Sequence, residues 1–199
     1  MPNSTLSIAS LVGSRICHDL ISPVGAISNG IELIAMGGPI DTPELSLISE
    51  SVDNATARIK FFRVAFGAAS GDQMIGAPEI AKIAREAFSS GRHTVDWQAR
   101  GDLSRPEVQA VFLAILCIET ALTRGGTITV TRNGKSFEVS GSGDRINCDP
   151  ALWKPLAATT PPDNLRPAQV QFALLPFAAQ DLGRKLSLQD GPREVRIAL

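Results

Sequence analysis

His18 is the residue of this chain whose neighbours best suit chemistry. If the segment is helical, Ser14 and Ser22 lie one turn before and one turn after it, and Gly25 and Asn29 continue the same stripe. All four neighbours are small or polar, so we expect the imidazole to stand on an uncrowded strip that faces solvent. An accessible imidazole with cations beside it suits an anionic group such as a phosphoryl.

Pro23 marks a break in this helix just past the histidine. Proline has no backbone N–H, so the carbonyl of Asp19 loses its helical partner and we expect the helix to bend or loosen there. Taken alone, an exposed histidine on a helix is more often only a surface residue, and Asp19 is equally well a solvated acid. Cys17 adds no Cys–His nucleophile, because adjacent helical residues point about 100° apart, and we expect its thiol to face inward.

Two long helices must position His18. In both, apolar residues recur at steps of three and four: Leu20, Val24, Ile27, Ile31 and Ile34 in the first, and Leu45, Ile48, Val52, Ala55, Ile59, Phe62 and Phe66 in the second. Glycines and prolines over residues 36–43 end one helix and start the next, which predicts an antiparallel hairpin. A lone hairpin buries only one seam, so we expect two copies to form a four-helix bundle in a homodimer.

The hairpin also predicts cations near the imidazole. If its turn centres near residues 39 and 40, His18 lies opposite residues 61 and 62. This register places Lys60 and Arg63, which flank the apolar seam, beside the imidazole.

The composition excludes several classes of partner. The 19 lysines and arginines nearly balance the 20 aspartates and glutamates, which is not the basic footprint of a nucleic-acid or anionic-membrane binder. The longest apolar run, Ala110 to Ile118, is far shorter than the ~20 residues of a membrane span. Three scattered cysteines and two histidines show neither metal-ligand spacing nor a disulfide framework. We therefore expect a cytoplasmic protein with no metal or cofactor of its own.

Downstream of residue 76 the pattern changes to alternating elements. Helices are predicted over residues 78–88, 106–122 and 168–182, and strands over residues 94–98, 127–132, 135–140, 185–189 and 194–199. Asn133-Gly134 is a hairpin turn signal, and the stretch rich in Gly, Pro and Asp that precedes residue 168 is interpreted as a loop. The predicted fold is α+β: a hairpin domain over residues 1–71, then an α/β sandwich with helices on one face of a mixed sheet over residues 76–199.

The segment around His18 resembles a known family. The sequence from His18 to Pro23, HDLISP, is similar to the H-box of two-component histidine kinases, in which an acid follows the histidine and a proline lies five residues on. The stretch from Cys17 to Gly30 is closer still to the first helix of the ChpT-like histidine phosphotransferases, and Phe61 to Gly67 resembles the end of their second helix. The resemblance extends over essentially the whole chain.

This resemblance implies a fold and a reaction. Members of the family combine a dimeric helical hairpin with a degenerate domain of the kinase ATP-binding fold. Their histidine takes a phosphoryl group from an aspartyl phosphate on one receiver domain and passes it to the aspartate of another. The implied partners are a second copy, the receiver domain of a hybrid sensor histidine kinase as donor, and response regulators as acceptors, with Mg²⁺ supplied by the receiver.

Only His18 carries over from the family as the phosphoacceptor. Asp19 is expected to orient the imidazole or to accept its proton, and Lys60 or Arg63 to help neutralise the phosphoryl group. Four further residues are expected to support the site by shaping the strip around the histidine: Ser14, Ser22, Pro23 and Asn29.

The resemblance also bears on the use of ATP. The kinases hold Mg²⁺ through an asparagine on a helix before a Gly-Gly turn, and the matching residues 111–126 contain no asparagine. They bind adenine through the aspartate of an Asp-x-Gly-x-Gly box, where this chain has Gly141, with Asp144 displaced and Arg145 in place of the second glycine. Bulky side chains over residues 169–176 replace the glycines of the kinase lid. We therefore expect no ATP binding.

Two other functions stay open at this point. A dimeric scaffold with a dead nucleotide domain would bind regulators without chemistry, but it would not require an accessible imidazole at His18. An ATP-dependent histidine kinase would need the asparagine and the aspartate that this sequence lacks.

Overall fold

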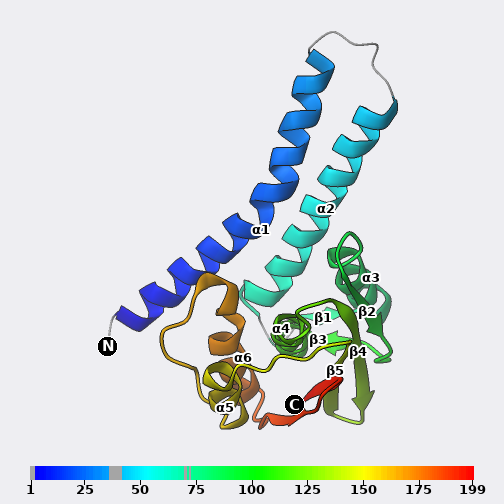
Figure 1. Cartoon of the computed structure of the whole chain (residues 1–199). Helices are drawn as coiled ribbons and strands as arrows, with labels where there is room; N and C mark the ends of the chain where they lie inside the picture. The colour runs from blue at the N-terminus through cyan, green and yellow to red at the C-terminus, as the bar shows by residue number, and fades with distance from the viewer. Residues whose placement is uncertain (1–2, 36–41, 70, 72) are drawn as a thin grey trace.

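The computed structural model describes residues 3–35, 42–69, 71 and 73–199 of the chain. Two helices, α1 (Asn3–Ala35) and α2 (Thr42–Phe66), lie side by side as an antiparallel hairpin that projects from the rest of the molecule (Figure 1). The turn predicted near residues 39 and 40 lies outside the described residues. Helix α1 continues through Pro23, and its axis changes direction between its two halves (Figure 1).

A five-stranded mixed sheet forms the opposite end of the molecule. Its strands are β2 (His93–Trp97), β4 (Gly126–Asn133), β5 (Ser136–Ser142), β7 (Glu194–Ala198) and β6 (Ser187–Asp190), hydrogen-bonded in that order. Strands β2 and β4 are parallel, and the other pairs are antiparallel. The β4–β5 hairpin turns through Gly134 with a φ of 61°, as the Asn-Gly signal predicted.

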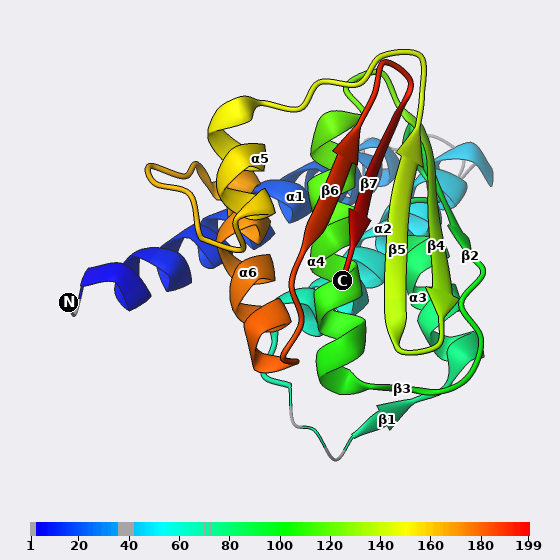
Figure 2. The ribbon, with the colours of Figure 1, turned by 90° about the horizontal axis from the view of Figure 1, so that it is seen from below.

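Helices cover one face of this sheet. Helix α3 (Ala77–Ala87) and α4 (Arg105–Ala121) lie behind it in Figure 2, with α6 (Gln171–Asp181) packed beside α4. A short 3₁₀ turn, η1 (Pro167–Gln169), precedes α6, and β1 (Met74–Ile75) pairs with β3 (Leu103–Ser104) away from the main sheet. The α+β prediction, with helices on one face of a mixed sheet, is therefore confirmed.

One helix was not predicted. Residues interpreted as loop contain α5 (Pro150–Ala157), which packs on α6. The Asp149 carboxylate caps it by accepting a hydrogen bond from the amide of Ala151 at 3.0 Å, and Pro150 occupies the first turn, where a missing N–H costs nothing. The sequence signal was an acidic cap followed by proline, hidden in a stretch whose composition is typical of loops.

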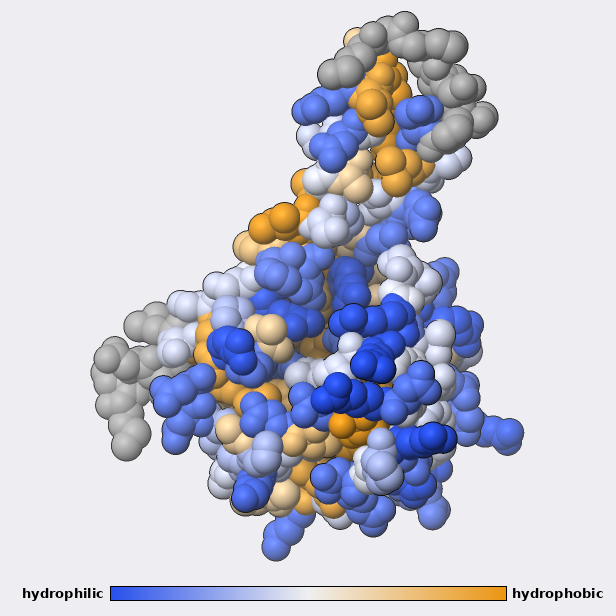
Figure 3. All heavy atoms as spheres, in the orientation of Figure 1, coloured by the Kyte–Doolittle hydropathy of each residue, from blue (hydrophilic) through white to orange (hydrophobic). Residues whose placement is uncertain are grey.

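The hairpin leaves much of its apolar surface exposed. Figure 3 shows hydrophobic side chains gathered along the upper hairpin, over both helices. We call the exposed members of this surface the hairpin face: Ile21, Val24, Ile31, Leu33, Leu45, Leu47, Val52 and Ile59, each between 44% and 70% exposed. A lone helical hairpin of this kind has no second layer of its own against which to bury them.

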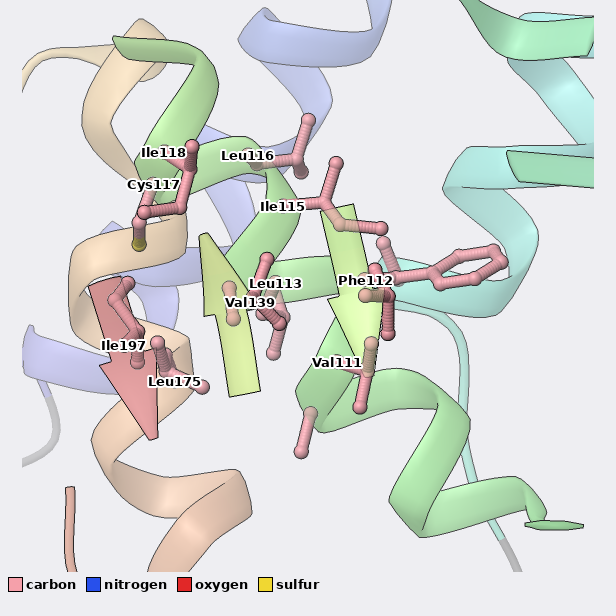
Figure 4. Packing of buried hydrophobic residues seen from close by; sticks show 14 of the residues in the cluster. Val111, Phe112, Leu113, Ile115, Leu116, Cys117, Ile118, Val139, Leu175 and Ile197 are labelled. Carbon is pink, nitrogen blue, oxygen red and sulfur yellow. The ribbon is translucent and has the colours of Figure 1, made fainter. Parts of the chain in front are cut away.

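The core is built around α4 and includes the end of α2. Most of α4 is buried, and its apolar side chains meet residues of the sheet and of α6, such as Val139, Ile197 and Leu175 (Figure 4). Phe61 and Phe62 of α2 belong to the same buried cluster. Two side chains of α4 satisfy carbonyls that end α2: Arg105 donates to Val64 and Arg63 at 2.7 and 2.6 Å, and Gln109 donates to Gly67 at 2.8 Å.

Candidate functional site

His18 stands exposed on α1, with one ring nitrogen engaged. Its side chain is 82% exposed, and its Nδ1 lies 3.1 Å from Oδ1 of Asp19. Ser14 and Ser22, one turn away on either side, are exposed as well, so the surface around the imidazole is uncrowded. Asn29 is also exposed, but it lies about 16 Å further along the helix axis.

The Asp19 carboxylate is held from its other side. Its Oδ2 lies 3.0 Å from Nη2 of Arg15, four residues earlier on the same helix. A carboxylate only accepts hydrogen bonds, so the contact with His18 requires a proton on Nδ1. This tautomer leaves the lone pair of Nε2 free on the exposed side of the ring, which is the arrangement of a nucleophile.

A groove of about 410 Å³ begins beside this pair and runs between the two helices. Asp19, Ser22 and Pro23 line it from α1, and Asn54 and Arg58 are among the residues that line it from α2. The guanidinium of Arg58 also lies 5.3 Å from the ring centroid of Phe88, a cation–π contact. Ser22 and Pro23 therefore face a groove that contains a cation.

The cation in this groove is not one of the two predicted. Lys60 lines a separate hollow between α2 and α3, with Asp53 and Glu86. Arg63 is exposed near the end of α2, where its carbonyl accepts from Arg105. The reason is geometric. Residues 61 and 62 point into the shared core, so Lys60 and Arg63, which flank them, point away from the groove. Arg58 faces α1.

Cys17 does not face inward as predicted. Its side chain is exposed, because the inner side of α1 at this level is occupied by Ile16, which packs against the core cluster. His93, the second histidine, is 6% exposed, and its Nε2 donates to the carbonyl of Leu122 at 2.9 Å. Within the described residues, no group of three or more His, Cys, Asp and Glu side chains is placed to hold a metal ion.

Gly141 is the residue that the resemblance to kinases implies at the place of their adenine-binding aspartate. Gly141 is buried in β5, and a Cβ added there would collide with Cγ2 of Ile118 and lie 3.2 Å from Cδ1 of Leu122. Further along, Trp153 of α5 packs edge-on against Phe172 of α6, with 5.7 Å between ring centroids. Apolar side chains fill these positions, and an aspartate side chain does not fit at Gly141.

Sequence reasoning missed three residues of this site. Arg58 was missed because the prediction placed residues 61 and 62, about one helical turn further along α2, opposite His18. Arg15 carried a usable signal, since an arginine four residues before an aspartate on a helix predicts a side-chain pair. Glu119 carried none: it approaches Arg15 at 3.7 Å from α4, through tertiary packing alone.

A hairpin with an exposed, acid-paired histidine, followed by a sheet domain, is the arrangement that the resemblance to histidine phosphotransferases implies. Residues 77–194 match the model of the histidine phosphotransferase C-terminal domain, and the chain belongs to this family. It is 34% identical to the protein phosphotransferase ChpT of Brucella abortus (strain 2308), over 93% of this chain and 91% of that protein.

A solved structure of a bacterial phosphotransferase superposes on the whole molecule. The TM-score is 0.82 at 31% sequence identity, and the match covers 98% of this chain and 96% of the other. The family predicted from the segment around His18 is therefore confirmed. Among the helices that the structure describes, none has the length and apolarity to cross a membrane.

Proposed function

We propose that this chain is the histidine relay of a two-component phosphorelay. The lone pair of Nε2 of His18 attacks the phosphorus of an aspartyl phosphate on a receiver domain, an N–P bond forms, and the receiver's carboxylate leaves. The reverse step transfers the phosphoryl group to the aspartate of a response regulator. The observation that carries this proposal is the exposed imidazole whose Nδ1 is engaged by Asp19.

The charges near His18 suit a docked receiver. Phosphoryl transfer depends on positioning and on neutralising charge. The two carboxylates nearest the site, Asp19 and Glu119, share the guanidinium of Arg15 and form no cluster for a hard cation, so we assign Mg²⁺ to the receiver. Arg58, in the groove that begins at Asp19, takes the charge-neutralising role that the sequence assigned to Lys60 or Arg63.

We further propose that the second domain binds no ATP. The stretch of residues 111–126 has no asparagine, and the position of the kinase aspartate is a glycine packed against Ile118 and Leu122. The neighbouring aspartate, Asp144, belongs to the segment that follows β5. These features support a relay that receives its phosphoryl group from another protein.

We also propose that the working form is a cytoplasmic homodimer. The hairpin face would be covered by the same face of a second copy, which gives a four-helix bundle. Val24 and Ile31 on the first helix, and Leu45, Val52 and Ile59 on the second, recur every seven residues, the heptad spacing of a packing seam. Three free cysteines are typical of a reducing compartment.

A phosphotransfer assay separates the relay from its alternatives. The full chain, His18→Asn and the control Lys82→Ala, an exposed position on α3, are each incubated with labelled ATP and, separately, with a panel of receiver domains phosphorylated by labelled acetyl phosphate. We expect acid-labile label on the wild type and on Lys82→Ala from at least one receiver, none from ATP, and none on His18→Asn.

Each other outcome overturns a stated part of the proposal. Label from ATP alone identifies a kinase. Receivers that bind but transfer no label identify a scaffold. Label that persists on His18→Asn places the phosphoacceptor elsewhere.

A further inference from the structure

A single guanidinium, that of Arg15, connects the acid beside His18 to the second domain. Its Nη2 lies 3.0 Å from Oδ2 of Asp19 and 3.7 Å from Oε2 of Glu119, on α4. Its Nη1 donates to the carbonyl of Ala168, in the turn before α6, at 3.2 Å. The side chain of Arg15 is 11% exposed, and those of Asp19 and Glu119 are 13% and 18% exposed, so water screens these contacts less than contacts at the surface.

The anchors on the second domain are themselves fixed. Glu119 belongs to α4, the most buried helix of the molecule. The carbonyl of Ala168 also accepts from Nε2 of Gln171, a buried side chain that donates to Oγ1 of Thr120 as well, each at 3.0 Å. Arg15 therefore meets two positions that cannot easily move relative to each other.

The planar fork of Arg15 decides how Asp19 faces the imidazole. Because Oδ2 is taken by the guanidinium, Oδ1 is left to accept from Nδ1 of His18. The tautomer of a histidine is set by the hydrogen bond that one of its nitrogens makes. Without the contact to Arg15, Asp19 would no longer fix the tautomer of the exposed imidazole.

We propose that Arg15 is a positioning residue for phosphoryl transfer, which uses the rigid second domain to hold Asp19 and thereby keeps the proton on Nδ1 and the lone pair on Nε2. In this role the sheet domain supports the histidine through the contacts of Arg15 with Glu119 and Ala168. The inference rests on the proposed function of His18 in phosphoryl transfer.

The chain is well suited to a direct test, because it has only two histidines. Long-range ¹H–¹⁵N spectra of the labelled full chain report the protonation of each ring nitrogen, and His18→Asn assigns the two sets of signals. The variants are Arg15→Ala, Arg15→Lys and Glu119→Gln. The control is Lys82→Ala, which removes another basic residue paired with an acid four positions away, at 3.8 Å, on α3. Urea unfolding checks that each variant is folded.

We expect the Nδ1–H form of His18 in the wild type and in Lys82→Ala, and a mixture of the two tautomers in Arg15→Ala. Transfer from a phosphorylated receiver should slow about tenfold or more in Arg15→Ala, with partial recovery in Arg15→Lys. Glu119→Gln should give an intermediate shift, because the intrahelical pair remains.

The failures of the two proposals are distinguishable. If Arg15→Ala keeps the wild-type tautomer and rate while the wild type still accepts a phosphoryl group, the role of Arg15 is overturned and His18 stands. If the wild type accepts no phosphoryl group, the proposed relay function is overturned. The spectra still show whether Arg15 controls the tautomer of His18. A fall in rate with no change in tautomer also contradicts the positioning role of Arg15.

Discussion

The ring of Phe61, on α2, stacks in parallel on the ring of Phe112, on α4, with 4.4 Å between centroids and 5° between planes. Phe61 also meets Phe88 edge-on, with 5.6 Å between centroids. Helix α2, which faces α1, is thus packed into the core of the second domain by aromatic contacts, in addition to the polar bridge from α1 through Arg15.

Phe61→Ala should destabilise the whole chain. Phe61 is fully buried, and truncation of a buried phenylalanine to alanine costs about 3–5 kcal/mol of unfolding free energy. Urea unfolding followed by circular dichroism measures the change. Phe177→Ala is the matched control, because Phe177 is 44% exposed and should cost less than about 1 kcal/mol. Equal effects of the two substitutions would show that the stacked ring does not join the hairpin to the sheet domain.

Val52→Asp should dissociate the proposed homodimer. Val52 lies in the hairpin face and is 44% exposed, so an aspartate is solvated in a single copy but buried, without a partner, between two. Light scattering at micromolar concentration should give twice the chain mass for the wild type and the chain mass for the variant. The control Met74→Asp changes an apolar side chain, 59% exposed, outside the hairpin and should leave the mass unchanged. A monomeric wild type would contradict the four-helix bundle.

Gly141→Asp should not restore a nucleotide site. The new side chain would collide with Ile118 and place a carboxylate in an apolar environment, so we expect a loss of about 2 kcal/mol or more of unfolding free energy. Calorimetry with ATP and Mg²⁺ should detect no binding to the variant. Gly25→Asp, on an open stretch of α1 where an added Cβ meets nothing within 4 Å, provides a glycine control that keeps most of its stability. ATP binding by Gly141→Asp would mean that the pocket had been retained.

Glu107 should make stability depend on pH. Burial opposes its ionisation, but hydrogen bonds from the backbone and hydroxyl of Ser104 and the charge of Arg184 outweigh burial, so the pKa of Glu107 lies below its ordinary value. The unfolded chain then binds this proton more tightly than the folded chain does. The stabilisation is complete at neutral pH, above the ordinary glutamate pKa of about 4.3, and is lost as the pH falls through the lower folded-state value.

The substitution Glu107→Gln isolates this contribution. At about pH 7 we expect it to lower the free energy of unfolding by about 1 kcal/mol, because a charged partner of Arg184 is lost. The difference from wild type should shrink as the pH falls through the lowered folded-state pKa of Glu107, where the wild-type carboxylate becomes protonated as well. A difference that stays constant over this range would exclude Glu107 as its source.

Much of the fold could be predicted from apolar spacing and turn residues. The second helix runs from Thr42 to Phe66, in agreement with the glycine and proline signal over residues 36–43 and with the three-four apolar pattern, whose last member is Phe66. The same apolar pattern did not distinguish residues on the hairpin face from residues packed against the sheet domain. Ile59 is exposed on the hairpin face, whereas Phe62, three residues on, is buried against the sheet domain.

The pair of His18 and Asp19 could be predicted from the sequence, but the contacts of Arg15 with the second domain could not. His18 and Asp19 are neighbours in sequence, and their contact follows from local geometry. Arg15 reaches Asp19 within one helical turn, but it reaches Ala168 across 153 positions of the chain. Contacts of that separation depend on how whole elements pack, and no local pattern records them.

The end of α2 limits how this protein can be divided or recombined. Four residues at the end of α2 belong to the hairpin by sequence but pack into the core of the sheet domain: Phe61, Phe62, Val64 and Ala65. A chimera that exchanges the hairpin at residue 67 for one from a related protein would also exchange these core residues. A working junction therefore lies within α2, before Arg58. The grafted segment then carries its own histidine, and the recipient keeps the aromatic residues of α2 that pack into its sheet domain.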